Sequence, residues 1–194
     1  MQNDEKRRQT PWTTSLLIEG TDIVLRPYRA ADLDALYDLT QQPEIREFLP
    51  DWNVPKERRQ EWLVKYEIPE NQRFLEVVAA RGHIGDLRLR LGIVSKETSQ
   101  FIGWCCTGIK DELSVPNREI VFAISHAYRN RGYATQAVGG LVDYLLTNTD
   151  TEVLNAVALV RNVSSNRVIQ KSGFEYIGTT DIDDETYNHY RGAR

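Results

Sequence analysis

The feature that most constrains the fold is the stretch Arg129-Asn-Arg-Gly-Tyr-Ala134, which lies between two strongly patterned segments. Before it, Glu119-Ile-Val-Phe-Ala-Ile124 is rich in β-branched and aromatic residues and predicts a strand. After it, residues 135–146 predict a helix with an apolar stripe toward the core. A glycine-bearing turn between a strand and a helix presents unsatisfied backbone N–H groups at the positive end of the helix dipole. Such a turn is a site for an anion, most often a phosphate.

Length, composition and charge exclude several classes of protein. The chain has 194 residues, of which 41% are hydrophobic and 27% charged, which is typical of a single globular domain. We expect residues 1–14 to be a flexible segment and residues 15–194 to form that domain. The net charge of −4 provides no basic field, so nucleic acid is not an expected partner.

The same reading predicts a cytoplasmic protein without a membrane partner. No window approaches the roughly 18 consecutive apolar residues of a membrane span, and the first residues lack the apolar core of a secretory signal. Cys105 and Cys106 are adjacent, which offers neither a metal-binding spacing nor a disulfide framework. We expect two core thiols on opposite faces of a strand, and no metal.

The remaining pattern predicts alternating strands and helices. Pro69 and Gly82 are expected to end helices, residues 44–53 and 110–117 to be loops, and Arg88 and Arg90 to point outward from a half-buried strand. A strand, the 129–134 turn, a helix and a further strand imply one parallel pair in an otherwise antiparallel sheet. The expected strands are 22–27, 87–91, a hairpin over 94–106, 119–124, 152–160 and a terminal hairpin over 174–191 around the acidic turn 181–185; the expected helices are 33–40, 55–67, a stretch ending at 82, 135–146 and 164–172.

Two signatures together resemble one family. Residues 119–134, with their Arg-x-x-Gly-x-Ala end, resemble the acyl-CoA pyrophosphate motif of the GNAT superfamily of N-acyltransferases. Asn162-Val-Ser-Ser-Asn-Arg-Val-Ile-Gln-Lys-Ser-Gly-Phe174 resembles the second signature of that superfamily. Leu25-Arg-Pro27, Asp32 and Phe101-Ile-Gly-Trp104 look like the branch of ribosomal-protein N-terminal alanine acetyltransferases, the Rim type. The resemblance implies an α+β GNAT fold: a mixed, mostly antiparallel twisted sheet of about seven strands flanked by helices, with its parallel pair at the cofactor site.

The resemblance also implies a set of acetyl-CoA contacts. The backbone of Ala123 and Ile124 would run beside the pantetheine arm, and Asn162 and Ser165 would face the cofactor. Asn162 could instead be a plain helix cap. The turn residues that would bind the pyrophosphate are Arg129, Asn130, Arg131, Gly132, Tyr133, Ala134 and Thr135.

The implied reaction is direct attack of a neutral amine on a thioester. Deprotonating an α-amino group at pH 7 costs about 1–1.5 kcal/mol, whereas a lysine amine costs about 4.5 kcal/mol. Glu119 is the candidate base, through a water, although a strand-end glutamate can also be simply solvated. A backbone N–H, such as that of Ile124, would stabilise the oxyanion. Many members have a tyrosine acid where this sequence has Ile169, which leaves Ser165 or water to protonate the thiolate.

The acceptor is the open part of the interpretation. Trp52 and Tyr187 are candidate acceptor contacts, although an aromatic such as Trp52 is as often part of the core. We expect an acetyl-CoA-dependent N-acetyltransferase that acts on a primary amine, with a protein or peptide N-terminus favoured, as a monomer or homodimer. A small-molecule amine, such as an antibiotic, a polyamine or an amino-acid analogue, is the alternative acceptor. A non-catalytic CoA-sensing module is a second alternative, whereas a nucleotide-binding domain is disfavoured because both usual phosphate-loop motifs are absent from the sequence.

Overall fold

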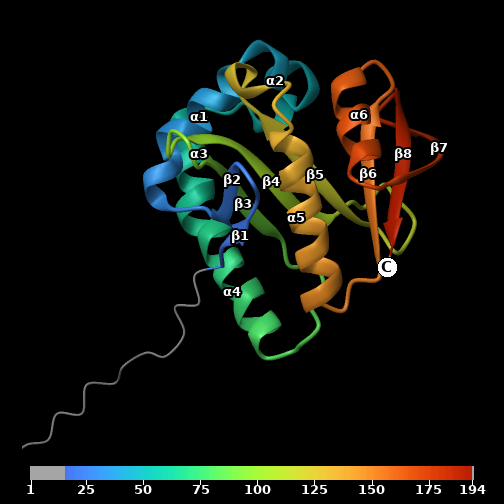
Figure 1. The fold of residues 1–194 in the computed structure, drawn as a ribbon, viewed down its shortest axis with the longest axis horizontal. Coiled ribbons are helices and arrows are strands. Elements are labelled where there is room, and N and C mark those ends of the chain that lie inside the picture. The colour runs from blue at the N-terminus through green and yellow to red at the C-terminus, as the bar shows by residue number, and fades with distance from the viewer. Residues whose placement is uncertain (1–15, 194) are drawn as a thin grey trace, which may run out of the picture.

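A single twisted sheet organises the structure, which is a computed structural model describing residues 16–193 (Figure 1). The predicted flexible segment over residues 1–14 lies outside the described residues. Within these residues the sheet has eight strands in the order β1-β2-β3-β4-β5-β6-β8-β7. The strands are β1 Ile18–Glu19, β2 Ile23–Pro27, β3 Leu89–Ser95, β4 Phe101–Ile109, β5 Arg118–Ile124, β6 Val153–Leu159, β7 Glu175–Ile182 and β8 Glu185–Ala193.

Antiparallel pairing joins all neighbouring strands except β5 and β6, which are parallel. The predicted sheet with one parallel pair is therefore confirmed. The short strand β1, which pairs with β2, was not predicted because two residues carry no periodicity. The terminal hairpin turns at Asp183 and Asp184, whose φ angles of 50° and 63° match a two-residue turn that is tighter than the predicted 181–185 turn.

Helices cover both faces of the sheet. They are α1 Leu33–Gln41, α2 Pro43–Phe48, α3 Lys56–Trp62, α4 Ile68–Ala79, α5 Tyr133–Asn148 and α6 Val163–Lys171, with short 3-10 turns at η1 Ala30–Asp32, η2 Pro50–Trp52 and η4 His126–Tyr128, and a π turn at η3 Leu63–Glu67. Figure 1 shows α5 crossing one face of the sheet, with α6 beside β6 and β8. The buried face of α5, including Ala137, Leu141 and Leu145, packs into the larger of two apolar clusters.

The two cysteines of β4 divide between these clusters. Cys105 belongs to the larger cluster under α5, whereas Cys106 belongs to the smaller cluster with Trp104 and the buried residues of α1 and α2. Both are free thiols. The prediction of two core thiols on opposite faces of one strand is confirmed.

Two predictions that rested on proline were wrong. Residues 44–53 were expected to form a loop, but they contain α2 and η2. Pro43 begins α2, because the N–H that proline lacks would have no partner in the first helical turn. The predicted helix end at Pro69 was also wrong, because the helical region continues through it. Leu63–Glu67 forms a π turn in which the Ile68 N–H donates to the Leu63 carbonyl, and this wider turn leads directly into α4.

Candidate active site

The candidate site lies between β5 and β6, beyond the point where the two strands pair. Their parallel register pairs Glu119 with Asn155, and both strands then continue, to Ile124 and Leu159, along the walls of a cavity of about 870 Å³. We call this the large cavity. Its other walls come from α2 and η2, the turn before α5, the start of α6 and the tip of the β7–β8 hairpin. Nearly all of the predicted site residues line it: Trp52, Glu119, Ala123, Ile124, Arg129, Asn130, Gly132, Tyr133, Ala134, Thr135, Asn162, Ser165 and Tyr187.

Arg131 is the predicted residue that does not line the large cavity. Its guanidinium lies over the ring of Tyr128, 5.7 Å from the ring centroid. A cation in that position is held by the negative face of the ring. Any contribution of Arg131 to the turn therefore comes from its backbone.

The turn before α5 has the geometry of an anion site. Gly132 is the residue before the first helical turn and adopts a left-handed conformation with φ 78°, a region that glycine enters without steric penalty. Asn130 is also left-handed, with φ 60°. The Gln136 N–H donates to the Gly132 carbonyl, so the helix begins here and the preceding N–H groups stay outside its hydrogen-bond ladder. The residues that carry the free N–H groups of the first helical turn, Tyr133, Ala134 and Thr135, line the large cavity.

The backbone of β5 presents alternate residues to β4 and to the large cavity. Ser125 N–H donates to the Ile102 carbonyl on β4. Because hydrogen-bonded and non-hydrogen-bonded pairs alternate along an antiparallel ladder, the backbone groups of Ile124 and Phe122 point toward β6. The Ile124 N–H is therefore directed away from β4, and its predicted oxyanion role stays a prediction. Ala123 directs its own N–H and carbonyl toward β4, whereas the backbone groups of Phe122, which sequence reasoning did not single out, face the large cavity.

Asn162 is the N-cap of α6. Its side-chain oxygen accepts from the Ser165 N–H at 3.1 Å and from the Ser164 hydroxyl at 3.1 Å. The capping alternative is thus observed, and Asn162 lines the large cavity at the same time. The cap fixes the first turn of α6 and so places the half-buried Ser165 on the cavity wall.

Glu119, the predicted base, has a raised pKa. Its side chain is partly buried at the start of β5. Burial raises the pKa of the Glu119 carboxyl to about 7, with Lys110 and Arg88 acting to lower it and Glu112 to raise it. A base with a pKa near the working pH combines a large ionised fraction with a strong affinity for the proton.

A second, small cavity of about 330 Å³ adjoins the large one. The two share Trp52, Lys110, Glu112, Glu119 and Val121. The floor of the small cavity is one face of β3, β4 and β5, and its further lining residues are Arg88, Arg90, Cys106, Thr107, Gly108, Ile109 and Asp111. Glu119 therefore lies at the junction of two connected spaces.

Aromatic side chains form part of this junction. Trp52 stacks on the fully buried Trp104, with ring centroids 4.8 Å apart and planes within 8°. One face of Trp52 thus packs on the core, and the residue also lines both cavities, while its contact with an acceptor stays a prediction. Tyr187 lines the large cavity, and burial, with Glu185 adding to it, raises the pKa of its hydroxyl, which keeps the phenol protonated. Ile169 of α6 is buried in the larger apolar cluster.

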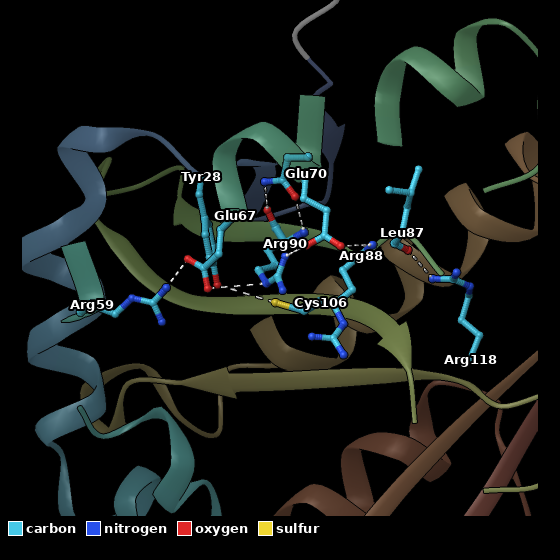
Figure 2. A network of polar contacts seen from close by, with 10 residues as sticks. Tyr28, Arg59, Glu67, Glu70, Leu87, Arg88, Arg90, Cys106 and Arg118 are labelled. Carbon is cyan, nitrogen blue, oxygen red and sulfur yellow. Dashed lines mark hydrogen bonds and ion pairs between the residues drawn. The ribbon is translucent and has the colours of Figure 1, made fainter. Parts of the chain in front are cut away.

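The prediction that the Arg90 side chain points outward from the sheet was wrong. The side chain points to the face opposite Leu89 and Leu91, but α3, the π turn and α4 cover that face. There Arg90 donates to Glu70 at 2.6 Å and lies 3.6 Å from Glu67, which also pairs with the buried Arg59 (Figure 2). The alternation in residues 87–91 was read correctly, but it cannot show which face carries a second layer of helices.

No cluster of metal ligands was found among residues 16–193. Within the same range, no helix combines the length and apolar character that a membrane crossing requires.

The sequence matches the model of a known protein family. A family model described as an acetyltransferase (GNAT) domain matches residues 22–175. A sequence comparison with curated proteins gives no match.

Solved structures of acetyltransferases share the fold. A GNAT-family acetyltransferase from Bacillus anthracis has a TM-score of 0.71 at 16% identity, covering 92% of this chain and 98% of that one. The aminoglycoside acetyltransferase AAC(6')-Ib, in complex with paromomycin and acetyl-CoA, has a TM-score of 0.70 at 17% identity, covering 89% and 94%. RimL, a ribosomal L7/L12 α-N-protein acetyltransferase in complex with CoA, has a TM-score of 0.69 at 15% identity, covering 92% and 98%.

At identities this low, the similarity to solved structures shows the fold alone, whereas the match to the family model shows the family. The eight-stranded, mostly antiparallel sheet is the α+β GNAT fold that the two signatures predicted, and RimL is among the solved structures that share it. Because the family model spans most of the chain, the protein belongs to the GNAT acetyltransferases, and the expected acetyl-CoA-dependent N-acetyltransferase is confirmed as its enzyme class.

Proposed function

We propose that the protein transfers the acetyl group of acetyl-CoA to the primary amine of a protein or peptide N-terminus. The observation that carries this proposal is the position of Glu119, a carboxyl with a pKa of about 7 at the junction of the large and small cavities. We assign acetyl-CoA to the large cavity and the acceptor amine to the small one. The cytoplasmic location expected from the sequence belongs to the same proposal, and the two free thiols support it.

The turn and the strand would hold acetyl-CoA together. The N–H groups of residues 130–134, at the positive end of α5, are suited to the pyrophosphate, whereas the Arg129 N–H already donates to the His126 carbonyl. The backbone groups of Phe122 and Ile124 that face β6 are suited to the amides of the pantetheine arm. This arrangement would bring the thioester beside the start of the small cavity, where Val121 lines both spaces.

The chemistry then needs two protons removed from the acceptor nitrogen and one supplied to the sulfur. Glu119, directly or through a water, takes the proton of the acceptor ammonium, and the neutral amine attacks the thioester carbonyl. The Ile124 N–H stabilises the developing oxyanion. The carbon–sulfur bond breaks as the tetrahedral intermediate collapses, and the nitrogen gives up its second proton. The Ser165 hydroxyl or a water relays that proton to the thiolate, so that the hydroxyl donates one proton to sulfur and regains one from nitrogen. A thiol has a pKa of about 8.5, so the departing thiolate needs little help, and a tyrosine at the position of Ile169 is not required.

A peptide N-terminus is favoured over a lysine side chain because its amine is deprotonated at a lower free-energy cost, within the reach of a base whose pKa is about 7. The similarity to RimL supports the same choice. The similarity to AAC(6')-Ib supports the alternative acceptor, a small-molecule amine.

Incubation with acetyl-CoA and unblocked peptides tests the proposal. We expect release of the CoA thiol and a peptide heavier by one acetyl group, located at the N-terminal amine by mass spectrometry. The same peptides with a blocked N-terminus but a free lysine are the control. Acetylation of small amines but of no peptide would establish the alternative acceptor, and tight CoA binding without any product would establish the non-catalytic module.

A further inference from the structure

A row of residues crosses three strands on the floor of the small cavity. The register pairs Leu89 of β3 with Thr107 of β4 and Gly108 of β4 with Glu119 of β5. Arg88, one residue before Leu89, therefore continues the register beside Gly108. Arg88, Gly108 and Glu119 all line the small cavity. The outer two are separated by two strand spacings, about 10 Å between backbones, with a glycine between them.

Gly108 leaves the space that the Arg88 side chain occupies. A Cβ atom on Gly108 would lie 3.0 Å from Arg88 Cγ and 3.2 Å from both its Cδ and Nε. The Arg88 side chain thus extends across the glycine, in the direction of β5, and contributes to the electrostatic environment of Glu119.

The guanidinium of Arg88 is uncommitted. The backbone N–H of Arg88 donates to Glu70 at 3.2 Å, but its guanidinium has neither a hydrogen bond nor an ion pair with any residue of the range 16–193. Figure 2 shows it pointing away from Glu70, whereas Arg90, two residues further along β3, points into the network with Glu67 and Glu70. One arginine of this strand is therefore structural, and the other is available to a ligand.

The two sides of the small cavity differ in charge. Lys110 pairs with Glu112 at 3.0 Å, which leaves Glu119 on β5 and Asp111 in the loop after β4 as the other carboxyls of the small cavity. The β3 side carries the unpaired guanidinium of Arg88. An amine placed against Glu119 would therefore have a fixed cation within reach of its neighbouring groups, which disfavours a polycationic molecule.

We propose that the acceptor carries a carboxylate close to its reactive amine and that Arg88 binds this carboxylate. The inference rests on the proposed function, because it assigns the acceptor to the small cavity. The guanidinium fork suits a carboxylate, with which it forms paired charge-assisted hydrogen bonds. The carboxylate can come from an acidic residue at the start of a peptide or from the α-carboxylate of a free amino acid. Arg88 is thus a specificity-determining residue, and Gly108 keeps its path open.

A panel of acceptors tests the proposal in the full chain. Peptides that begin Ala-Asp, Ala-Asn and Ala-Lys share one reactive amine and differ in the charge beside it, and free alanine with alaninamide forms the second arm. We expect kcat/KM for Ala-Asp to exceed that for Ala-Asn about 10-fold, and that for Ala-Lys by more, because hydrogen bonds to charged groups are worth more than neutral ones. A preference for Ala-Asp assigns the carboxylate to a peptide, whereas a preference confined to alanine over alaninamide assigns it to a free amino acid.

Three variants connect the preference to Arg88. Arg88→Gln should abolish the discrimination between Ala-Asp and Ala-Asn, and Arg88→Glu should reverse it in favour of Ala-Lys. Gly108→Ala should weaken the discrimination while retaining the arginine, because the added Cβ displaces a flexible side chain. Arg73→Gln, an exposed arginine on α4 outside both cavities, is the matched control and should keep the wild-type preference.

Binding measured separately from turnover distinguishes the two proposals. Calorimetric titration of the same acceptors into the protein saturated with CoA reports the carboxylate preference without chemistry. A preference that depends on Arg88, with no acetylated product, would overturn the proposed function and support this inference. Equal binding or turnover of all acceptors, or the same preference in Arg88→Gln, or no binding of any acceptor, would overturn the inference.

Discussion

Glu119 of β5 and Asn155 of β6 form the parallel pair beyond which the two strands enclose the large cavity. Asn155 is fully buried, and its side-chain hydrogen bonds fix the position of this pair. Its side-chain amide donates to the carbonyls of Pro116 at 2.8 Å and Arg118 at 3.2 Å, and its oxygen lies 2.9 Å from His189 Nε2 on β8. One side chain thus connects three strands directly beside the candidate base.

Asn155→Ala should lower the free energy of unfolding by about 1–3 kcal/mol, because it leaves the buried Arg118 carbonyl without this donor. It should also lower kcat/KM, because Glu119 loses its fixed position. Denaturant unfolding and steady-state kinetics measure the two effects. A loss of stability accompanied by unchanged kinetics would show that Asn155 supports the sheet alone.

Glu119→Gln should lower kcat/KM by about 10²–10⁴-fold at pH 8, the usual contribution of a general base. In the wild type, kcat/KM should fall as the pH drops below about 7, because the carboxyl is then protonated. The variant should lack that pH dependence and should bind acetyl-CoA as the wild type does. A wild-type profile that is flat between pH 6 and 8 would contradict the assignment.

The stability of the same variant should change in the opposite sense. The folded-state pKa of Glu119 is raised above the ordinary value, so its ionisation opposes folding as the pH rises through about 7. Glu119→Gln removes that ionisation. Its melting temperature should therefore equal or exceed that of the wild type at pH 8, with less difference at pH 5.

Gly132→Glu should abolish acetyl-CoA binding. The substitution places a side chain at a φ of 78° and a carboxylate where the pyrophosphate would lie, so strain and charge repulsion act together. Calorimetry with acetyl-CoA measures the loss. Unimpaired binding would show that the turn does not hold the pyrophosphate.

Gly139→Ala is the matched control on α5. A Cβ there would meet open space, whereas a Cβ at the adjacent Gly140 would lie 3.0 Å from Ile18 on β1. Gly139→Ala should therefore leave acetyl-CoA binding intact and stabilise the protein by about 0.5–1 kcal/mol through helix propensity. Gly140 is thus explained by close approach of β1, and Gly139 is the tolerated defect.

Glu67→Gln should destabilise the protein by about 3–5 kcal/mol, because it leaves the buried guanidinium of Arg59 without its counter-charge. Arg90 retains Glu70, so the effect should centre on the junction of α3 and α4. Thermal unfolding measures it, and Glu61→Gln, which removes an exposed i,i+4 pair with Lys65, should change stability by less than about 0.5 kcal/mol. Equal effects of the two substitutions would exclude a structural role for the buried network.

The sequence predicted most of the site because local rules govern its parts. A glycine that must adopt a left-handed conformation, a strand before it and a helix after it are properties of neighbouring residues, so residues 119–135 could be interpreted without the fold. The cap at Asn162 is local in the same way. The helix after Pro43 and the π turn before Pro69 were missed because a proline can begin a helix as well as end one, and neighbouring residues do not decide between these roles.

The sequence by itself determined the family, the turn that begins α5 and the identity of the candidate base. Only the tertiary structure decided that Glu119 lines both cavities and that Arg90 is bound in a buried network of charges. Only the tertiary structure, likewise, decided that the Arg88 side chain extends across Gly108 in the direction of β5. The reason is physical. Alternation along β3 assigns Arg88 and Arg90 to one face, but whether a charge on that face meets a carboxylate or an open cavity depends on residues that are distant in sequence and that come together only when the sheet and its helices pack.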